Sequence, residues 1–243
     1  MDIFSDLEAE YDRLENILCE LDEHRWTSMS GAPGWTVSDV VLHLAQTDES
    51  VVISLTAPTE ATSWREDDVT IDDMAEAMVR SQRAEPTAVF DRWRAARRAS
   101  VAALRTADPH RRFSWAAAPL KPITLATTRL AEHWAHGLDI TEPFGIDYPD
   151  TDRLRHIAWL GYSTQPYAFG LEGVQPAPLY CELTGPNGDV WCFGSSDAAT
   201  RIVGSAGDFC RVGARRLLPG DSGLTATGPH AQLALRVLRN YAY

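Results

Sequence analysis

Apolar side chains recur at every third or fourth position through most of the first 145 residues. This spacing lines them up on one face of a helix, so it predicts amphipathic helices with a buried stripe. Four long helices joined by loops predict a four-helix bundle. The helical stretches are 3–23, 36–55, 70–106 and 122–145. Pro86 interrupts or restarts the third stretch, and the fourth ends at a Pro and a Gly.

The ends of these stretches carry helix-start and loop signals. Thr36 stands in the N-cap position of the second stretch, and Asp39 follows three residues later, which is the form of a capping box. Pro122 suits a first helical turn, where a missing backbone N–H costs little. The segments "SGAPGW", "TAPTEATSWREDD" and "TADPHRRFSWAAAPLKP" contain the Gly, Pro and polar residues typical of loops.

The pattern changes after Gly145. Residues 150–171 still have helical spacing, but Leu179, Cys181 and Leu183 alternate with other residues. The turn residues "GPNGD" follow, and "VWCFG" then completes the signature of a β-hairpin. Two further segments, "SAGDFCRVGARRLL" and "HAQLALRVLRNYA", are predicted helices. The fold class is therefore α plus α+β, with a four-helix bundle over 1–146 and a small α+β domain over 147–243.

Charge and composition narrow the classes of function. The net charge is −12, and no block of Lys and Arg is present, so we expect no nucleic-acid partner and no binding to anionic membranes. No run of 18 apolar residues predicts a membrane span, and the acidic residues of 1–25 are unlike a signal peptide. We expect a cytoplasmic protein with four reduced, mostly buried thiols. They belong to Cys19, Cys181, Cys192 and Cys210.

The stretch "RLAEHWAHGLDI" holds the strongest candidate chemistry. Glu132 and His136 are four residues apart, so they lie on one helix face and can ligate a single metal ion. A third ligand must come from another helix, and His43, within the apolar "VVLHLA", is the best candidate. His133 lies about 100° around the helix from Glu132, so we assign it to the surface or to a supporting position beside the site.

Simpler readings of the same residues stay open on spacing alone. A His on an apolar helix is often a hydrogen-bonded core residue, and a Glu–His pair one turn apart is often a solvated ion pair. Asp39 either caps its helix or orients the imidazole of His43, one turn further on. Asp139 is similarly open to two interpretations.

Two motifs together resemble a known family. "APGWTVSDVVLHLA" is similar to the segment that opens the second helix of the DinB-like metalloprotein superfamily. It looks most like the actinobacterial branch that includes mycothiol-dependent maleylpyruvate isomerase. "RLAEHWAHGLDITEPFG" is similar to the fourth helix of that branch. The resemblance implies that His43, Glu132 and His136 are the metal ligands, and the glutamate favours this branch over relatives that use three histidines.

The resemblance also implies roles in the C-terminal domain, where "GPNGDVWCFG" and "VGSAGDFCRVGARR" look like the branch's α+β domain. An arginine there contributes to activity in the isomerase, and we assign this role to Arg215, with Arg216 as the alternative. Arg211 and Arg216 are assigned as contacts for the cofactor, although all three arginines are also compatible with an ordinary surface. With the three metal ligands, Arg215 completes the predicted catalytic set.

The implied function is that of a metal-dependent isomerase or thiol S-transferase. The metal would be zinc, with nickel, iron or manganese as alternatives for two imidazoles and one carboxylate. Mycothiol would supply the thiol, and a small molecule would be the substrate of a monomer or homodimer. "TAPTEATSWREDD" and "FSWAAAPLKP" differ from the isomerase and are expected to line or cover the pocket. An enzyme of secondary metabolism that needs no thiol, or a non-catalytic metal- or ligand-binding protein, are the alternatives.

Overall fold

The computed structural model describes residues 2–57, 70–116 and 118–240. The chain divides after Tyr148 into two compact units, and each is described by itself. The N-terminal unit is helical, and the C-terminal unit joins short helices to a four-stranded sheet. The fold class predicted from the sequence is confirmed.

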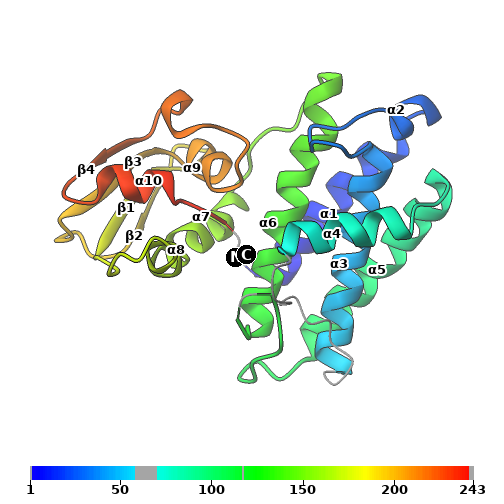
Figure 1. Ribbon diagram of the computed structural model, residues 1–243, viewed down its shortest axis with the longest axis horizontal. Helices are drawn as coiled ribbons and strands as arrows, with labels where there is room; N and C mark the ends of the chain where they lie inside the picture. The colour runs from blue at the N-terminus through cyan, green and yellow to red at the C-terminus, as the bar shows by residue number, and fades with distance from the viewer. Residues whose placement is uncertain (1, 58–69, 117, 241–243) are drawn as a thin grey trace. The chain divides into compact units, whose positions relative to one another are not determined.

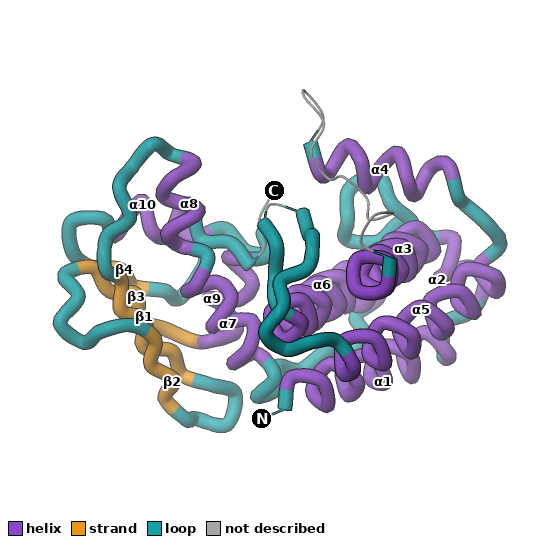
Figure 2. Tube along the Cα trace, turned by 90° about the horizontal axis from the view of Figure 1, so that it is seen from below, coloured by secondary structure: helices purple, strands orange, loops and turns teal. Residues whose placement is uncertain are grey.

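The N-terminal unit is built on four long helices that run side by side (Figures 1 and 2). The third long helix packs against both the second and the first, and the fourth packs against all three others. Shorter helices join them. The bounds are α1 Ile3–Cys19, α2 Glu23–Thr27, α3 Val37–Thr56, α4 Ile71–Ser81, α5 Pro86–Thr106, α6 Pro122–Thr141 and the 3-10 turn Glu142–Phe144.

Helix starts follow the local sequence. Thr36 accepts a hydrogen bond from the Asp39 N–H, and the Asp39 carboxylate accepts one from the Thr36 N–H, so the predicted capping box is present. Pro86 and Pro122 each occupy the first turn of a helix. The predicted helix over 3–23 is too long, because α1 ends at Cys19 and the Asp22 carboxylate caps a new helix, α2.

Helix α4 crosses the bundle over α3 (Figure 1). The Gln46 amide on α3 donates a 3.0 Å hydrogen bond to the Met78 carbonyl of α4. The guanidinium of Arg83, just beyond α4, binds both carboxylate oxygens of Asp39 at 2.8 and 3.0 Å. These two contacts fix α4 to the N-terminal half of α3.

The C-terminal unit has a mixed sheet in the order β2-β1-β3-β4. The predicted hairpin is present, because β1 pairs antiparallel with β2. Two strands were not predicted from the sequence: β3, which pairs parallel with β1, and β4, which pairs antiparallel with β3. The bounds are α7 Leu154–Ser163, α8 Gln165–Leu171, β1 Leu179–Thr184, β2 Val190–Phe193, β3 Thr200–Ser205, α9 Ala206–Gly213, the 3-10 turn Pro219–Asp221, β4 Thr225–Thr227 and α10 Ala231–Arg236.

Two further predictions for this unit need correction. The helix predicted over 150–171 is two helices, because Pro166 begins the first turn of α8. Only Cys181 and Cys210 are buried, whereas Cys19 and Cys192 are exposed, so the thiols are not mostly buried. Within residues 2–57, 70–116 and 118–240, no helix combines the length and the apolar character that crossing a membrane requires.

Candidate metal centre

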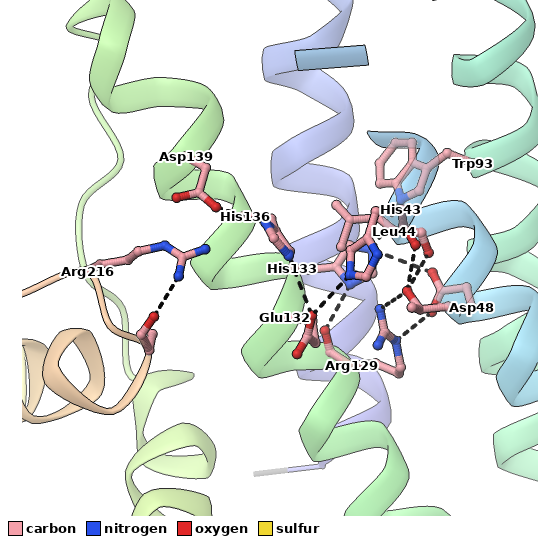
Figure 3. A network of polar contacts seen from close by, with 12 residues as sticks. His43, Leu44, Asp48, Trp93, Arg129, Glu132, His133, His136, Asp139 and Arg216 are labelled. Carbon is pink, nitrogen blue, oxygen red and sulfur yellow. Dashed lines mark hydrogen bonds and ion pairs between the residues drawn. The ribbon is translucent and has the colours of Figure 1, made fainter. Parts of the chain in front are cut away.

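The structure brings His43, Glu132 and His136 together inside the bundle (Figure 3). His43 comes from α3, and the other two lie one turn apart on α6. The Nε2 atoms of both imidazoles lie 3.6 Å from the same Glu132 Oε2. One donor atom from each residue lies within 4.8 Å of the other two. The sequence spacing therefore identified a true cluster, joined from two helices.

The cluster has the donor set and spacing of a transition-metal site. Two ligand atoms bound to a tetrahedral ion at 2.0–2.1 Å are separated by about 3.4 Å, close to the 3.6 Å from each imidazole Nε2 to Glu132 Oε2. The side chains of His43 and His136 are each 12% exposed and that of Glu132 is 26% exposed. The residues thus fit a metal ion, and solvent reaches the group through its carboxylate.

The surroundings favour the protonation states that ligation requires for two of the three residues. Burial lowers the pKa of His43, and the charges of His136 and Arg129 act in the same direction. Burial alone would raise the pKa of Glu132, but its contacts with the two imidazoles and the Arg129 charge hold it well below 4.5. A neutral imidazole and an ionised carboxylate are the ligating forms.

His136 is held by a carboxylate on its far side. Its Nδ1 atom lies 2.8 Å from Asp139 Oδ2, so the ring donates from Nδ1 and its Nε2 faces Glu132. Burial opposes a charge on His136, but Asp139 and Glu132 outweigh it and raise the imidazole pKa above 6.5. A carboxylate behind a histidine is the usual support of a metal ligand.

Asp39 does not act in this way toward His43. Its oxygens accept hydrogen bonds from the Thr36 N–H and from Arg83. Of the two readings of Asp39, the structure shows the helix cap.

A buried ion pair that was not predicted from the sequence lies beside the cluster. Arg129 is one turn before Glu132 on α6 and is 1% exposed, and Asp48 on α3 is fully buried. Arg129 Nε donates to Asp48 Oδ1 at 3.0 Å, and its Nη2 donates to the Thr47 hydroxyl at 2.7 Å. The Tyr11 hydroxyl also donates to Asp48, at 2.8 Å. The spacing of apolar residues predicts which apolar side chains are buried. It does not predict that two charged side chains are buried together as an ion pair.

His133 is fully buried, so the surface position considered for it is wrong. Trp93 Nε1 donates to His133 Nε2 at 3.1 Å, which places the ring proton on Nδ1, 2.9 Å from the Arg129 carbonyl. Burial, together with the Arg129 charge, holds the pKa of His133 well below 6.5. His133 is therefore a neutral core residue that links α5 to α6 and directly follows Glu132 of the cluster (Figure 3).

The three predicted arginines lie in the C-terminal unit. Arg211 makes two hydrogen bonds to the Asp150 carboxylate, at 2.8 and 3.0 Å. Arg215 is exposed with a left-handed backbone (φ 62°), and Arg216 donates to the Ala214 carbonyl at 2.6 Å. Their catalytic and cofactor-binding roles stay predictions.

Most of the loop "TAPTEATSWREDD", predicted to line the pocket, lies outside the described residues. The second predicted lining segment forms a short antiparallel bridge, in which Phe113 and Leu120 exchange backbone hydrogen bonds of 2.8 and 2.9 Å. The Ser54 hydroxyl on α3 donates to the Ser114 carbonyl at 2.5 Å. This segment is thereby fixed to the C-terminal part of α3.

A helical bundle joined to a small α+β unit, with a His/Glu/His cluster drawn from two bundle helices, defines a protein of the DinB-like class. Residues 7–141 match the family described as "Mycothiol maleylpyruvate isomerase N-terminal domain", and the chain belongs to this family.

Similarity to other proteins extends over nearly the whole chain. The chain is 35% identical to an uncharacterized protein found in two strains of Mycobacterium tuberculosis, over 98% of this chain and 94% of that protein. The crystal structure of the mycothiol-dependent maleylpyruvate isomerase matches with a TM-score of 0.62. It covers 93% of this chain and 95% of the isomerase at 16% identity, and a variant of that isomerase matches with a TM-score of 0.61. These two likenesses show a shared fold.

Proposed function

We propose that this protein is a metal-dependent enzyme that holds a divalent ion, zinc in the first instance, on His43, Glu132 and His136. The supporting observation is the half-buried cluster of these three side chains on the fold of a mycothiol-associated family. Among the described residues, the cluster contains three potential ligands and no fourth His, Cys, Asp or Glu. Three protein ligands are the pattern of catalytic zinc, whereas structural zinc takes four.

The reaction that this site supports is addition of a thiol to an electrophilic carbon. When bound, the ion supplies a Lewis acid that lowers the pKa of a thiol or water in the open position. Asp139 keeps the proton of His136 on Nδ1 and leaves Nε2 for ligation. Glu132 contributes one negative charge to the ligand set, so a divalent ion keeps a net positive charge and favours an anionic ligand such as a thiolate.

Mycothiol is the proposed thiol, and a small conjugated or otherwise electrophilic molecule is the proposed substrate. Addition to one carbon of a conjugated double bond, rotation, and elimination would return the thiol unchanged and give cis–trans isomerisation. Addition without elimination would give thiol transfer. Both outcomes use the same ligands, so the choice between them depends on the substrate.

Elemental analysis of the purified protein tests the metal. We expect one equivalent in the wild type and a loss of bound metal in His43→Ala and His136→Ala, both of which should stay folded by circular dichroism. His110→Ala is the matched control, because His110 is exposed and is not part of the cluster. Full metal content in either cluster variant would contradict the ligand assignment.

Activity is tested with mycothiol and two kinds of acceptor. Isomerisation of maleylpyruvate is followed by absorbance, and transfer to activated alkenes or epoxides is followed by loss of free thiol. We expect turnover of at least one acceptor by the metal-loaded wild type and none by His136→Ala. A loaded wild type that consumes no thiol and isomerises no substrate would overturn the thiol-dependent function while leaving the metal site intact.

A further inference from the structure

The two imidazoles of the cluster are supported in different ways. The Nδ1 atom of His136 is bound to the Asp139 carboxylate. In the part of the chain that the structure describes, no hydrogen bond to the Nδ1 atom of His43 is present. Its ring lies instead against the indole of Trp35, with ring centroids 5.0 Å apart. Trp35 is also nearly parallel to the His136 ring, at 6.3 Å and 24°.

The indole is itself anchored by a second carboxylate. Trp35 Nε1 donates a 2.5 Å hydrogen bond to Glu76 Oε2, and Glu76 comes from α4. Arg80, one turn further along α4, donates to the other Glu76 oxygen at 2.7 Å. Because a hydrogen bond from the ring nitrogen restricts rotation of the indole, Glu76 fixes the plane against which His43 packs.

The loop that carries Trp35 is built for this placement. Ser30 N–H donates to the Trp35 carbonyl at 2.9 Å, and Gly34 has a left-handed backbone (φ 80°), which favours glycine. Gly31 N–H donates to the Asp139 carbonyl at 2.7 Å, and a Cβ at Gly31 would lie only 3.1 Å from the Asp139 Cα. The Gly-Ala-Pro-Gly segment thus docks on α6 beside His136 and directs Trp35 to the cluster.

We propose that Trp35 and Glu76 form a positioning pair that holds the His43 imidazole in its ligating orientation, as Asp139 does for His136. The proposal rests on the metal-dependent function proposed above. It extends the support of the site to α4, since Glu76 is on that helix. Neither residue ligates the metal or takes part in the chemistry. The contacts of Gln46 with Met78 and of Arg83 with Asp39 hold α4 in place without Glu76, so removal of Glu76 need not release the helix.

The test is Co²⁺ binding to the metal-free, full-length protein, measured by competition with a chromophoric chelator. Trp35→Ala should raise the Kd about 10- to 100-fold, the usual effect of losing a partner that orients a metal ligand. Glu76→Ala should raise it less, because the indole stays in contact with His43. Glu76→Gln keeps an oxygen that accepts the indole N–H and should restore most of the affinity.

Two matched variants separate positioning from general effects. Trp26→Ala removes a buried indole of α2 that packs on Phe90 of α5. This variant should be less stable than the wild type but should bind Co²⁺ with unchanged affinity. Asp72→Ala removes an exposed carboxylate from the same helix as Glu76 and should leave the affinity unchanged.

The visible absorption bands of the Co²⁺-saturated protein give a readout that lower fold stability does not alter. Trp35→Ala and Glu76→Ala should shift or weaken these bands, because His43 no longer binds in one orientation, and Trp26→Ala should not. Wild-type affinity and spectrum in both site variants would overturn the positioning pair alone. Failure of the wild type to bind Co²⁺ would overturn the metal-dependent function and the positioning pair together.

Discussion

The buried Asp48–Arg129 pair makes a quantitative prediction about stability. Arg129→Met keeps a long apolar stem and removes the only cation that hydrogen-bonds the fully buried Asp48 carboxylate in the described residues. Asp48 must then either stay charged without that partner or take up a proton. Protonation limits the loss, because neutralising a carboxyl of pKa 3.8 at pH 7 costs about 4 kcal/mol, at 1.36 kcal/mol per pH unit.

The pH dependence identifies the cause. Burial raises the pKa of Asp48 in the wild type, and the Arg129 charge opposes that rise. Without Arg129 the folded-state pKa rises further above the unfolded value, so stability falls as pH increases from the unfolded toward the folded pKa. At pH 5 the same calculation sets an upper limit of about 1.6 kcal/mol on the loss. The defect of Arg129→Met should therefore shrink steadily between pH 7 and pH 5.

The assay is urea unfolding of the metal-free protein, followed by far-ultraviolet circular dichroism, at several pH values across this range. Asp48→Asn combined with Arg129→Met is the control, because the amide oxygen still accepts the Tyr11 hydroxyl and neither charge remains. The double variant should be more stable than Arg129→Met at pH 7 and should have a pH-independent defect. A loss in Arg129→Met that is the same at pH 5 and pH 7 would falsify the assignment of Asp48 as a buried, ionised partner.

Two further predictions concern the supports of the site. Asp139→Ala should weaken Co²⁺ binding about 10- to 100-fold in chelator competition, because His136 loses the partner that fixes its tautomer, and unchanged affinity would contradict this role. Burial alone would raise the pKa of Asp39, but hydrogen bonds from Arg83 and Thr36 outweigh it and lower this pKa below 3.8. The ionised carboxylate therefore stabilises the fold above pH 3.8, and this contribution is lost as the pH falls further. Asp39→Asn should therefore be less stable than the wild type near pH 6 in urea unfolding, with a gap that closes toward pH 3, and a gap that persists in acid would contradict the ion pair.

The sequence predicts the parts of this fold that local chemistry controls. The capping box at Thr36, the proline in the first turn at Pro122 and the "GPNGD" hairpin all specify their conformation within a few residues. Strand β3 escaped prediction because its partner β1 is parallel, so their pairing joins segments that no tight turn connects. The break between α1 and α2 depends on the cap formed by Asp22, a signal that the continuing apolar pattern obscures.

The same distinction applies to the site. Glu132 and His136 were predictable because four residues on a helix place two side chains on one face. The pairing of Arg129 with Asp48 was not predictable, because the two residues lie on different helices and the sequence of each helix shows only an isolated charged residue. Their ion pair is seen only when the two helices are packed together. Trp35 was likewise unassigned, since a tryptophan beside a loop carries no sign of what its ring will contact.

The neutrality of the Asp48–Arg129 pair bears on what the proposed metal site can bind. Taken together, the pair adds no net charge, so an ion on two neutral imidazoles and one carboxylate would keep a single positive charge. Arg129 nevertheless belongs to the same helix as Glu132, and its charge lowers the pKa of both Glu132 and His43. It therefore favours the deprotonated ligands over the protonated ones without adding a negative group that would repel an anion. A site with these properties suits an incoming thiolate or carboxylate better than a neutral ligand, as thiol addition requires.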